Sequence, residues 1–348
     1  MHTHDNPTHT RRDFLKTTAA GIAAGSVIGM AGTARGGFAG DGAFGLEKRR
    51  LGKTGMEVSV LGFGGAEIGY GRVEQERVSE LLNTALDQGL DAVDTAECYV
   101  ESETLIGNAI GHRRDDYSLF TKVGHWPSGK DGWSAEGITR SIERSLERLK
   151  TDHIDLVHLH SCGIDVLKEG DAIEALEKAR DAGKTRFIGY SGDAAPARFA
   201  VETGRFDTLM TSLSIFDQES IDLTLPLCRE QDMGVIVKRG IGNAVWRYDE
   251  FPTNGYYQEY WRRMQKLDYD FMRPANRDNT GPDGPAGIAL RFVLSQHGVH
   301  TNVVGTTNPK RFAQNAELLK AGPLDAEQVE AIRTRWKDVA EEGWVGQI

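Results

Sequence analysis

Eight short apolar runs between residues 58 and 307 constrain the fold of this chain more than any other feature. Each has the length of a β-strand, and in order they read VSVLGFGG, LDAVDTA, YSLFTKVG, IDLVHLH, TRFIGYSG, TLMTSLSIF, GVIVKRG and TNVVGTT. Helical patterns separate most of them. In GITRSIERSLERLK, for example, Ile138, Ile142, Leu146 and Leu149 fall on one face of a helix. Alternating strands and helices predict a parallel sheet that the helices cover.

Eight such strand–helix units predict a closed (β/α)8 barrel, the TIM barrel. An open doubly wound sheet is the alternative, and it requires a GxGxxG turn between the first strand and a helix. The segment LGFGGAEIGYG, residues 61–71, has glycines but not that spacing. The closed barrel is therefore the predicted fold.

Two elements are expected outside the strand–helix rhythm. KRRLGKTGMEVS, with a turn at Lys53-Thr54-Gly55, predicts a β-hairpin ahead of the barrel. Residues 241–285, after the seventh strand, form a long aromatic-rich insertion. Connections of this length are usually functional lids or disordered, and a helical insertion with its own small core is the alternative. No Pro/Gly/Ser linker divides residues 46–348, so they are predicted to form one domain.

Residues 1–45 are excluded from the predicted domain. TRRDFLK, residues 10–16, followed by an Ala/Gly-rich run, resembles a twin-arginine export signal, with Gly32-Thr33-Ala34 as a cleavage site. A basic disordered tail is the alternative. The run is too short and too glycine-rich for a membrane anchor, and such signals are addresses read by a receptor. The sequence thus predicts the twin-arginine export machinery as a partner, and a periplasmic or otherwise extracytoplasmic protein.

Charge and cysteine content exclude several classes of function. The 348 residues carry a net charge of -10, which argues against nucleic acid or an anionic membrane as the main partner. Cys98, Cys162 and Cys228 form no CxxC motif and no zinc-ligand spacing, so free thiols are expected. His158 and His160 lie two residues apart, and no metal site is predicted from them.

Polar residues at the strand ends suggest a chemical site, because such barrels gather their chemistry at the C-terminal ends of the strands. Lys122 lies in an apolar strand, where its charge is costly unless a carboxylate meets it, and Asp94 on the neighbouring strand is the expected partner. An ammonium beside Tyr99 should lower the pKa of its phenol from about 10, which makes it a better proton donor. His160 is expected to orient the substrate carbonyl.

These four residues and their surroundings resemble the aldo-keto reductase family. The resemblance covers residues 46 to about 320 and rests on DTAECY with Ser102-Glu103 and Gly107, on FTKVG, IDLVHLH and GKTRFIGYS, and on ALRFVLSQHGVHTNVVGTTNPKRFAQN. It implies an oxidoreductase that transfers a hydride between a nicotinamide dinucleotide and an aldehyde, ketone or sugar carbonyl, or the matching alcohol. NADP is the implied cofactor, with NAD as the alternative.

The resemblance also implies which residues bind the dinucleotide. In the closing segment, Thr306, Arg311 and Asn315 match the family's grip on the 2′-phosphate, for which arginine is well suited. Gly305 and Thr307 belong to the same loop. Lys238 and Arg239 are expected near the pyrophosphate, and Ser191 is expected near the nicotinamide. An exposed arginine at the start of a helix is the plainer interpretation of Arg311.

The sequence departs from the family pattern around the expected nicotinamide. Gly192 stands where family members usually have asparagine, and Val100 replaces a common glycine. Met210, Leu213 and Ser214 occupy the positions of the usual glutamine, stacking tyrosine and asparagine. A dinucleotide-binding accessory barrel with little catalysis is therefore an alternative. A metal-dependent sugar isomerase or a glycosidase is a third, but a glycosidase needs two carboxylates and the strand ends offer only Asp94.

Overall fold

The computed structural model describes residues 44–125 and 132–347 of the chain. The predicted export signal falls on residues outside these two ranges, so it stays a prediction. Among the described residues, no helix is both long enough and apolar enough to cross a lipid bilayer. All three cysteines are buried and free, as expected.

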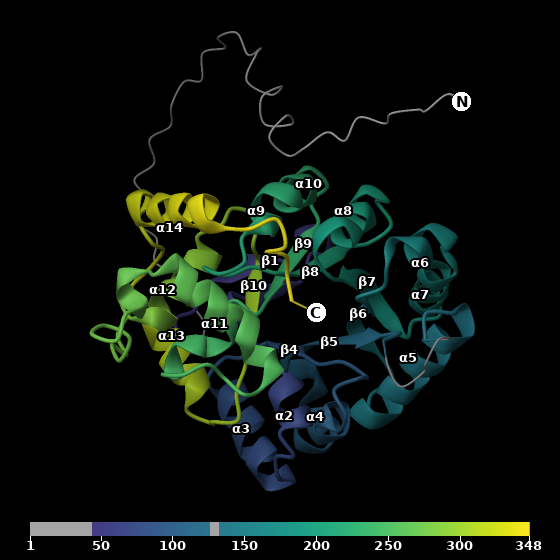
Figure 1. Cartoon of the computed structure of the whole chain (residues 1–348). Coiled ribbons are helices and arrows are strands. Elements are labelled where there is room, and N and C mark those ends of the chain that lie inside the picture. The colour runs from purple at the N-terminus through teal and green to yellow at the C-terminus, as the bar shows by residue number, and fades with distance from the viewer. Residues whose placement is uncertain (1–43, 126–131, 348) are drawn as a thin grey trace, which may run out of the picture. The chain divides into compact units, whose positions relative to one another are not determined.

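Within these residues, eight parallel strands close into a barrel, which confirms the predicted fold (Figure 1). Each predicted apolar run contains one strand. The strands are β3 (Leu61–Gly64), β4 (Ala92–Asp94), β5 (Ser118–Val123), β6 (Ile154–His160), β7 (Thr185–Ser191), β8 (Thr208–Ser212), β9 (Gly234–Lys238) and β10 (Thr301–Gly305). The last strand, β10, pairs with the first barrel strand, β3, and closes the ring.

Helices lie outside the strands and cover them (Figure 1). They are α2 (Ala66–Tyr70), α3 (Gln75–Asp87), α4 (Ser102–Ile110), α5 (Ala135–Leu149), α6 (Ile164–Glu169), α7 (Asp171–Asp181), α8 (Ala194–Glu202), α9 (Glu219–Leu223), α10 (Leu225–Glu230), α12 (Pro285–Leu294), α13 (Arg311–Leu319) and α14 (Ala326–Val339). Local signals mark the ends of these helices: Ser134 caps α5 by accepting from the backbone of Gly137. Gly89 and Gly183 have positive φ just after α3 and α7.

The insertion after β9 is ordered and largely helical. It contains the 3-10 turns η4 (Gly242–Arg247) and η5 (Asp270–Met272) and the helix α11 (Gly255–Leu267). From α11, Tyr260 and Arg263 are buried and both contact Asp217 in the loop after β8. The insertion is therefore fixed to the barrel and does not form a separate core.

A hairpin plugs the N-terminal end of the barrel. Strands β1 (Lys48–Arg50) and β2 (Glu57–Ser59) are antiparallel, and the 3-10 turn η1 (Gly52–Thr54) joins them. Leu51, Met56 and Val58 pack into one apolar cluster with inward side chains of the barrel strands. This end is closed, which leaves the C-terminal ends of the strands, here called the mouth, as the open end.

Strand periodicity places the polar residues above this apolar plug. Side chains two residues apart in a strand share a face. Phe120 lies in the inner apolar cluster, so Lys122, two residues later in β5, also faces inward. Leu156 lies in the same cluster, so His158 and His160 of β6 face inward as well. Ala92 likewise orients Asp94 inward. The sequence thus builds an apolar floor with a polar layer between that floor and the mouth.

Candidate active site

A buried ion pair joins β4 and β5. The Lys122 Nζ donates to both oxygens of Asp94, at 2.8 and 2.7 Å, and to the carbonyl of Thr95 at 2.7 Å. The two side chains are almost fully buried. Burial raises the pKa of Asp94, although the ammonium opposes this shift. The predicted pairing of Lys122 with Asp94 is therefore present, and it uses all three protons of the ammonium.

The loop that carries Tyr99 is fixed by the Ser-Glu pair that follows it. Thr95 Oγ1 donates to Ser102 Oγ at 2.8 Å, and Ser102 Oγ donates to the carbonyl of Gly65 at 2.8 Å. Glu103 accepts from Thr121 Oγ1 at 2.7 Å. Both residues of the pair are buried. These bonds tie the start of α4 to β5 and to the end of β3, and so fix the position of Tyr99.

Tyr99 is half-buried and lies against the ion pair by its ring. The Lys122 Nζ is 4.9 Å from the ring centroid, a cation–π contact. The expectation that Lys122 lowers the pKa of the phenol is wrong: burial raises that pKa well above its usual value, and the Asp94 charge adds to the rise. The physical reason is that Asp94 neutralises the ammonium, so desolvation decides the shift. Tyr99 therefore keeps its proton throughout the neutral pH range.

His160 lies across from Tyr99 at the end of β6. Their ring centroids are 6.1 Å apart with nearly perpendicular planes, and the His160 Nδ1 is 3.4 Å from the Cys98 Sγ. Burial, with the charge of Lys122 added, lowers the pKa of His160 well below its usual value. The imidazole is thus neutral. Asp94, Tyr99, Lys122 and His160 all meet at the mouth.

His158, left as a core residue by the sequence, is one layer deeper. It is buried, and its Nε2 is 3.1 Å from Thr208 Oγ1. Burial lowers its pKa well below the usual value. It lies beneath the four mouth residues as a neutral core side chain.

Ser191 and Lys238 end the strands β7 and β9, and their side chains differ in whether they have hydrogen-bond partners. Ser191 is fully buried, and its Oγ has no hydrogen-bond partner within the described residues. The Lys238 Nζ instead donates to Asp193 at 2.6 Å and to Ser212 Oγ at 2.8 Å. Although burial opposes ionisation, Lys238 and the hydrogen bonds to Asp193 hold the pKa of that carboxyl below its usual value. The charge of Lys238 is already neutralised within the protein.

The C-terminal segment reaches this cluster from α14 (Figure 1). The carbonyl of Gln347 lies 3.4 Å from the Lys238 Nζ. Gly346 packs so closely on Asp193 that an added Cβ would lie 2.1 Å from its carboxyl carbon. Arg263 of the insertion donates to the carbonyl of Val345 at 3.0 Å. The insertion and the C-terminal segment therefore cover this side of the mouth together.

Arg239 follows Lys238 with a left-handed backbone, φ 60°. Its guanidinium lies 4.9 Å from the ring centroid of Tyr256, the second residue of α11. Tyr256 is exposed, and it also contributes to the raised pKa of Tyr99. Arg239 thus contacts the insertion, and its expected place near the pyrophosphate stays a prediction.

The predicted phosphate-binding segment runs from the end of β10 into α13. Gly305 ends the strand, Thr306 Oγ1 accepts from the backbone N–H of Asn308 at 3.0 Å, and Thr307 is exposed. Arg311 is the exposed first residue of α13, and its guanidinium makes no hydrogen bond or ion pair with the rest of the described chain. Asn315, one turn later, is buried. A free cation therefore stands at this helix start.

The departures from the family pattern have clear positions. Met210 is fully buried in the inner apolar cluster, and Leu213 lies in the outer core. Ser214 is buried and accepts from the backbone of Phe216. Val100 has φ 50°, a conformation that favours glycine and strains a β-branched residue. Met210 in β8, and Leu213 and Ser214 just after it, thus supply neither an aromatic ring nor an amide group to the mouth.

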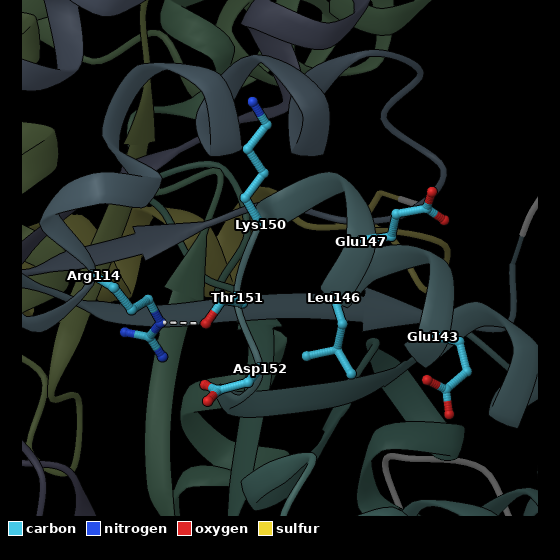
Figure 2. A pocket seen from close by; sticks show the side chains of 7 residues that line it. All are labelled: Arg114, Glu143, Leu146, Glu147, Lys150, Thr151 and Asp152. Atoms are coloured by element: carbon cyan, nitrogen blue, oxygen red, sulfur yellow. Dashed lines mark hydrogen bonds between the residues drawn. The ribbon is translucent and has the colours of Figure 1, made fainter.

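A separate surface hollow lies away from these residues. Figure 2 shows its lining, which consists of Arg114, Glu143, Leu146, Glu147, Lys150, Thr151 and Asp152. The last two precede β6, so the hollow is near the N-terminal ends of the strands. Its most buried cation, Arg114, is already bound to Thr151 at 3.2 Å and to Asp155 at 2.6 Å. The hollow is shallow surface between charged side chains, lies apart from the four mouth residues, and is not treated as a second candidate site.

Comparison with known proteins identifies the family. A profile of the Aldo/keto reductase family matches residues 60–337. The chain belongs to the Aldo/keto reductase family. This aldo-keto reductase is accordingly an oxidoreductase enzyme.

Three relatives illustrate the match. The holo form of an aldo-keto reductase from Bacillus halodurans is 29% identical with a TM-score of 0.68, covering 85% of this chain and 98% of that one. An uncharacterised oxidoreductase of Bacillus subtilis is 28% identical over 84% of this chain and 97% of its own length. The L-galactose dehydrogenase of Arabidopsis thaliana is 34% identical over 55% of this chain and 64% of its own length.

Two contacts in this aldo-keto reductase were missed by the sequence interpretation. One is the pair of hydrogen bonds that Lys238 donates to Asp193 and Ser212. A signal was available for it, because Asp193 lies two residues after the end of β7, and Ser212 and Lys238 end the next two strands of the ring. The other is the contact between the Cys98 thiol and the His160 imidazole. Its distance depends on the path of the loop before Tyr99, which no strand pattern predicts.

A close backbone contact in this aldo-keto reductase gives a testable prediction. A Cβ added to Gly69 of α2 would lie 1.9 Å from the carbonyl oxygen of Tyr99. Gly69→Ala should therefore push the Tyr99 loop aside, lowering turnover at least tenfold and the unfolding free energy by about 1–3 kcal/mol. Gly255→Ala is the control, because no atom lies within 4 Å of its added Cβ. Steady-state kinetics and denaturant unfolding measure both; equal behaviour of the two variants would contradict the prediction.

Proposed function

We propose that this enzyme uses NADP to interconvert an aldehyde, ketone or sugar carbonyl and its alcohol, with Tyr99 as the proton donor. The observation that supports this most is the meeting of Asp94, Tyr99, Lys122 and His160 at the open end of the barrel. Bound NADP(H) supplies or accepts the hydride at the substrate carbon.

The protein residues handle the substrate oxygen. Tyr99 holds its proton because burial raises the pKa of the phenol, so it is in the donor state when an alkoxide forms beside it. The Lys122–Asp94 pair supports the ring from one side. His160 is neutral and hydrogen-bonds the same oxygen, which orients the carbonyl. Reduction needs the protonated phenol as donor, and oxidation of an alcohol would need the phenolate as base.

Several residues suit a phosphorylated dinucleotide. Arg311 offers an exposed guanidinium that no described residue neutralises, and Thr306 and Asn315 lie in the same β10–α13 segment. An arginine fork at this place fits the 2′-phosphate that distinguishes NADP from NAD. Ser191 holds a buried oxygen without a partner in the described residues, which suits a contact to the nicotinamide amide. Lys238 fits less well, since Asp193 already binds it.

The rim of the mouth favours a ring-shaped substrate. Tyr70 and Tyr256 are exposed large aromatics, and the Tyr70 ring lies 5.8 Å from that of Tyr99. Aromatic faces pack well against the C–H face of a sugar ring. The similar Arabidopsis thaliana enzyme is an L-galactose dehydrogenase. We therefore place aldoses first among the carbonyl substrates to test.

The proposed cofactor role of Arg311 is tested by binding. Arg311→Met should raise the Kd for NADPH roughly 10- to 100-fold, the effect of losing a charged hydrogen bond. The Kd for NADH should not change. Fluorescence titration measures both, and Arg77→Met, on an exposed arginine of α3, is the control. An equal loss for both cofactors would contradict the assignment of the 2′-phosphate to Arg311.

The catalytic proposal is tested on the same protein with a panel of aldoses, aldehydes and ketones and NADPH consumption as readout. Turnover of at least one carbonyl is expected. NADPH binding without turnover of any member would instead support the accessory barrel.

Export by the twin-arginine route to an extracytoplasmic compartment is part of the proposal and rests on TRRDFLK alone.

A further inference from the structure

The thiol of Cys98 is the only group hydrogen-bonded to the imidazole of His160 among the residues that the structure describes. The Cys98 Sγ lies 3.4 Å from the Nδ1 of His160. We propose that Cys98 is a positioning residue that donates its S–H to this nitrogen and so fixes the His160 tautomer that carries its proton on Nε2. The inference rests on the proposed function, because it concerns how His160 presents a hydrogen to the substrate oxygen.

The direction of this hydrogen bond depends on which of the two groups is the better acceptor, because each carries one proton. A neutral imidazole has one N–H and one acceptor nitrogen. His160 is neutral because burial lowers its pKa, and Lys122, His125, Lys238 and His158 all oppose a positive charge there. Burial raises the pKa of Cys98 to about 11, so the thiol is protonated at neutral pH. A thiol sulfur is only a weak acceptor, whereas an unprotonated imidazole nitrogen accepts well, so the favoured arrangement has the thiol donating to Nδ1 and the imidazole proton on Nε2.

This tautomer is the one that the proposed reaction needs. No described residue binds Nε2, so it is the nitrogen left for a substrate oxygen. With the proton on Nδ1, Nε2 would present a lone pair to the lone pairs of a carbonyl, which is repulsive. The hydrogen bond at one ring nitrogen decides which nitrogen carries the proton.

Both partners are held independently of this contact. Tyr70 Oη donates to the carbonyl of Cys98 at 3.1 Å, and Trp133 Nε1 donates to the carbonyl of His160 at 3.1 Å. Cys98 also directly precedes Tyr99, so the loop that places the proton donor places the thiol as well. The side chain of Cys98 can therefore be changed while both backbones stay anchored.

The test is ¹⁵N NMR of the ring nitrogens in the full-length protein without cofactor, with the His160 signals assigned by their loss in His160→Gln. The wild type should show the proton on Nε2. Cys98→Val removes the donor and should introduce the Nδ1–H tautomer, whereas Cys98→Ser keeps a donor and should retain the wild-type tautomer. A wild-type signal with the proton on Nδ1, or an unchanged tautomer in Cys98→Val, would overturn the proposal.

Kinetics provide a second readout. In Cys98→Val, kcat should fall roughly 3- to 10-fold, the effect of one neutral hydrogen bond, with the Kd for NADPH unchanged and with recovery in Cys98→Ser. Equal losses in both variants would contradict the role of the donor. The NMR result does not depend on turnover. A wild type that reduces no carbonyl but shows the expected tautomer response would sink the proposed function and leave the positioning role of Cys98 standing.

Discussion

Replacing Tyr99 with phenylalanine should lower kcat by roughly 10²- to 10⁴-fold, the contribution of a positioned proton donor. The substitution removes one oxygen and keeps the ring on which the Lys122 ammonium lies. The Kd for NADPH should therefore stay within about twofold of the wild type. Steady-state kinetics with a reducible carbonyl and fluorescence titration measure the two effects.

Tyr117→Phe is the matched control for this substitution. Tyr117 is also a buried phenol whose pKa burial raises, to about 12, but it lies just before β5, at the end of the strand opposite the mouth. Tyr117→Phe should therefore leave kcat unchanged. If Tyr99→Phe retained wild-type turnover, Tyr99 would not be the proton donor, and the enzyme would need another acid at the mouth.

The second large effect is expected at the buried ion pair. Lys122→Met leaves the Asp94 carboxylate buried without its cation, which should lower the unfolding free energy by about 3–5 kcal/mol. Turnover should be lost as well, because the support of the Tyr99 ring goes with the ammonium. Replacing both residues, with Asp94→Val added to Lys122→Met, should recover much of the stability but none of the turnover.

A double-mutant cycle by denaturant unfolding measures this coupling. The exposed pair of Arg198 and Glu202 on α8 is the control, and its loss should cost less than about 1 kcal/mol. Strict additivity of the two substitutions at Asp94 and Lys122 would contradict the ion-pair account. Recovery of turnover in the double variant would show that the pair serves the fold alone.

The fold and the meeting of the four site residues were predictable because they depend on local patterns. The apolar runs marked the strands, and the two-residue period placed Asp94 and Lys122 on inner faces of adjacent strands. The pKa of Tyr99 was not predictable, since it depends on how completely Asp94 neutralises Lys122 and how much water reaches the phenol. Both quantities depend on how the side chains pack in three dimensions.

Long-range contacts were equally hidden. Lys238 has a place in the chain that suits a phosphate, yet its Nζ lies 3.4 Å from the carbonyl of Gln347, more than a hundred residues away. No periodicity links a strand end to the last residues of a chain. The contact of Lys238 with Gln347 therefore depends on the path of the C-terminal segment, whereas the place of Arg311 follows from the helix that comes next after β10.

The closure of the ring by β10 on β3 has a consequence for biosynthesis. Leu61 pairs with Asn302, so the two edges of the growing sheet stay unpaired until residue 302 has left the ribosome. Unpaired strand edges invite association with other chains, and contacts between distant parts of a sequence form slowly. The nascent protein thus passes through a long aggregation-prone interval, and its yield in cells should depend more on protection during synthesis than on the stability of the finished barrel.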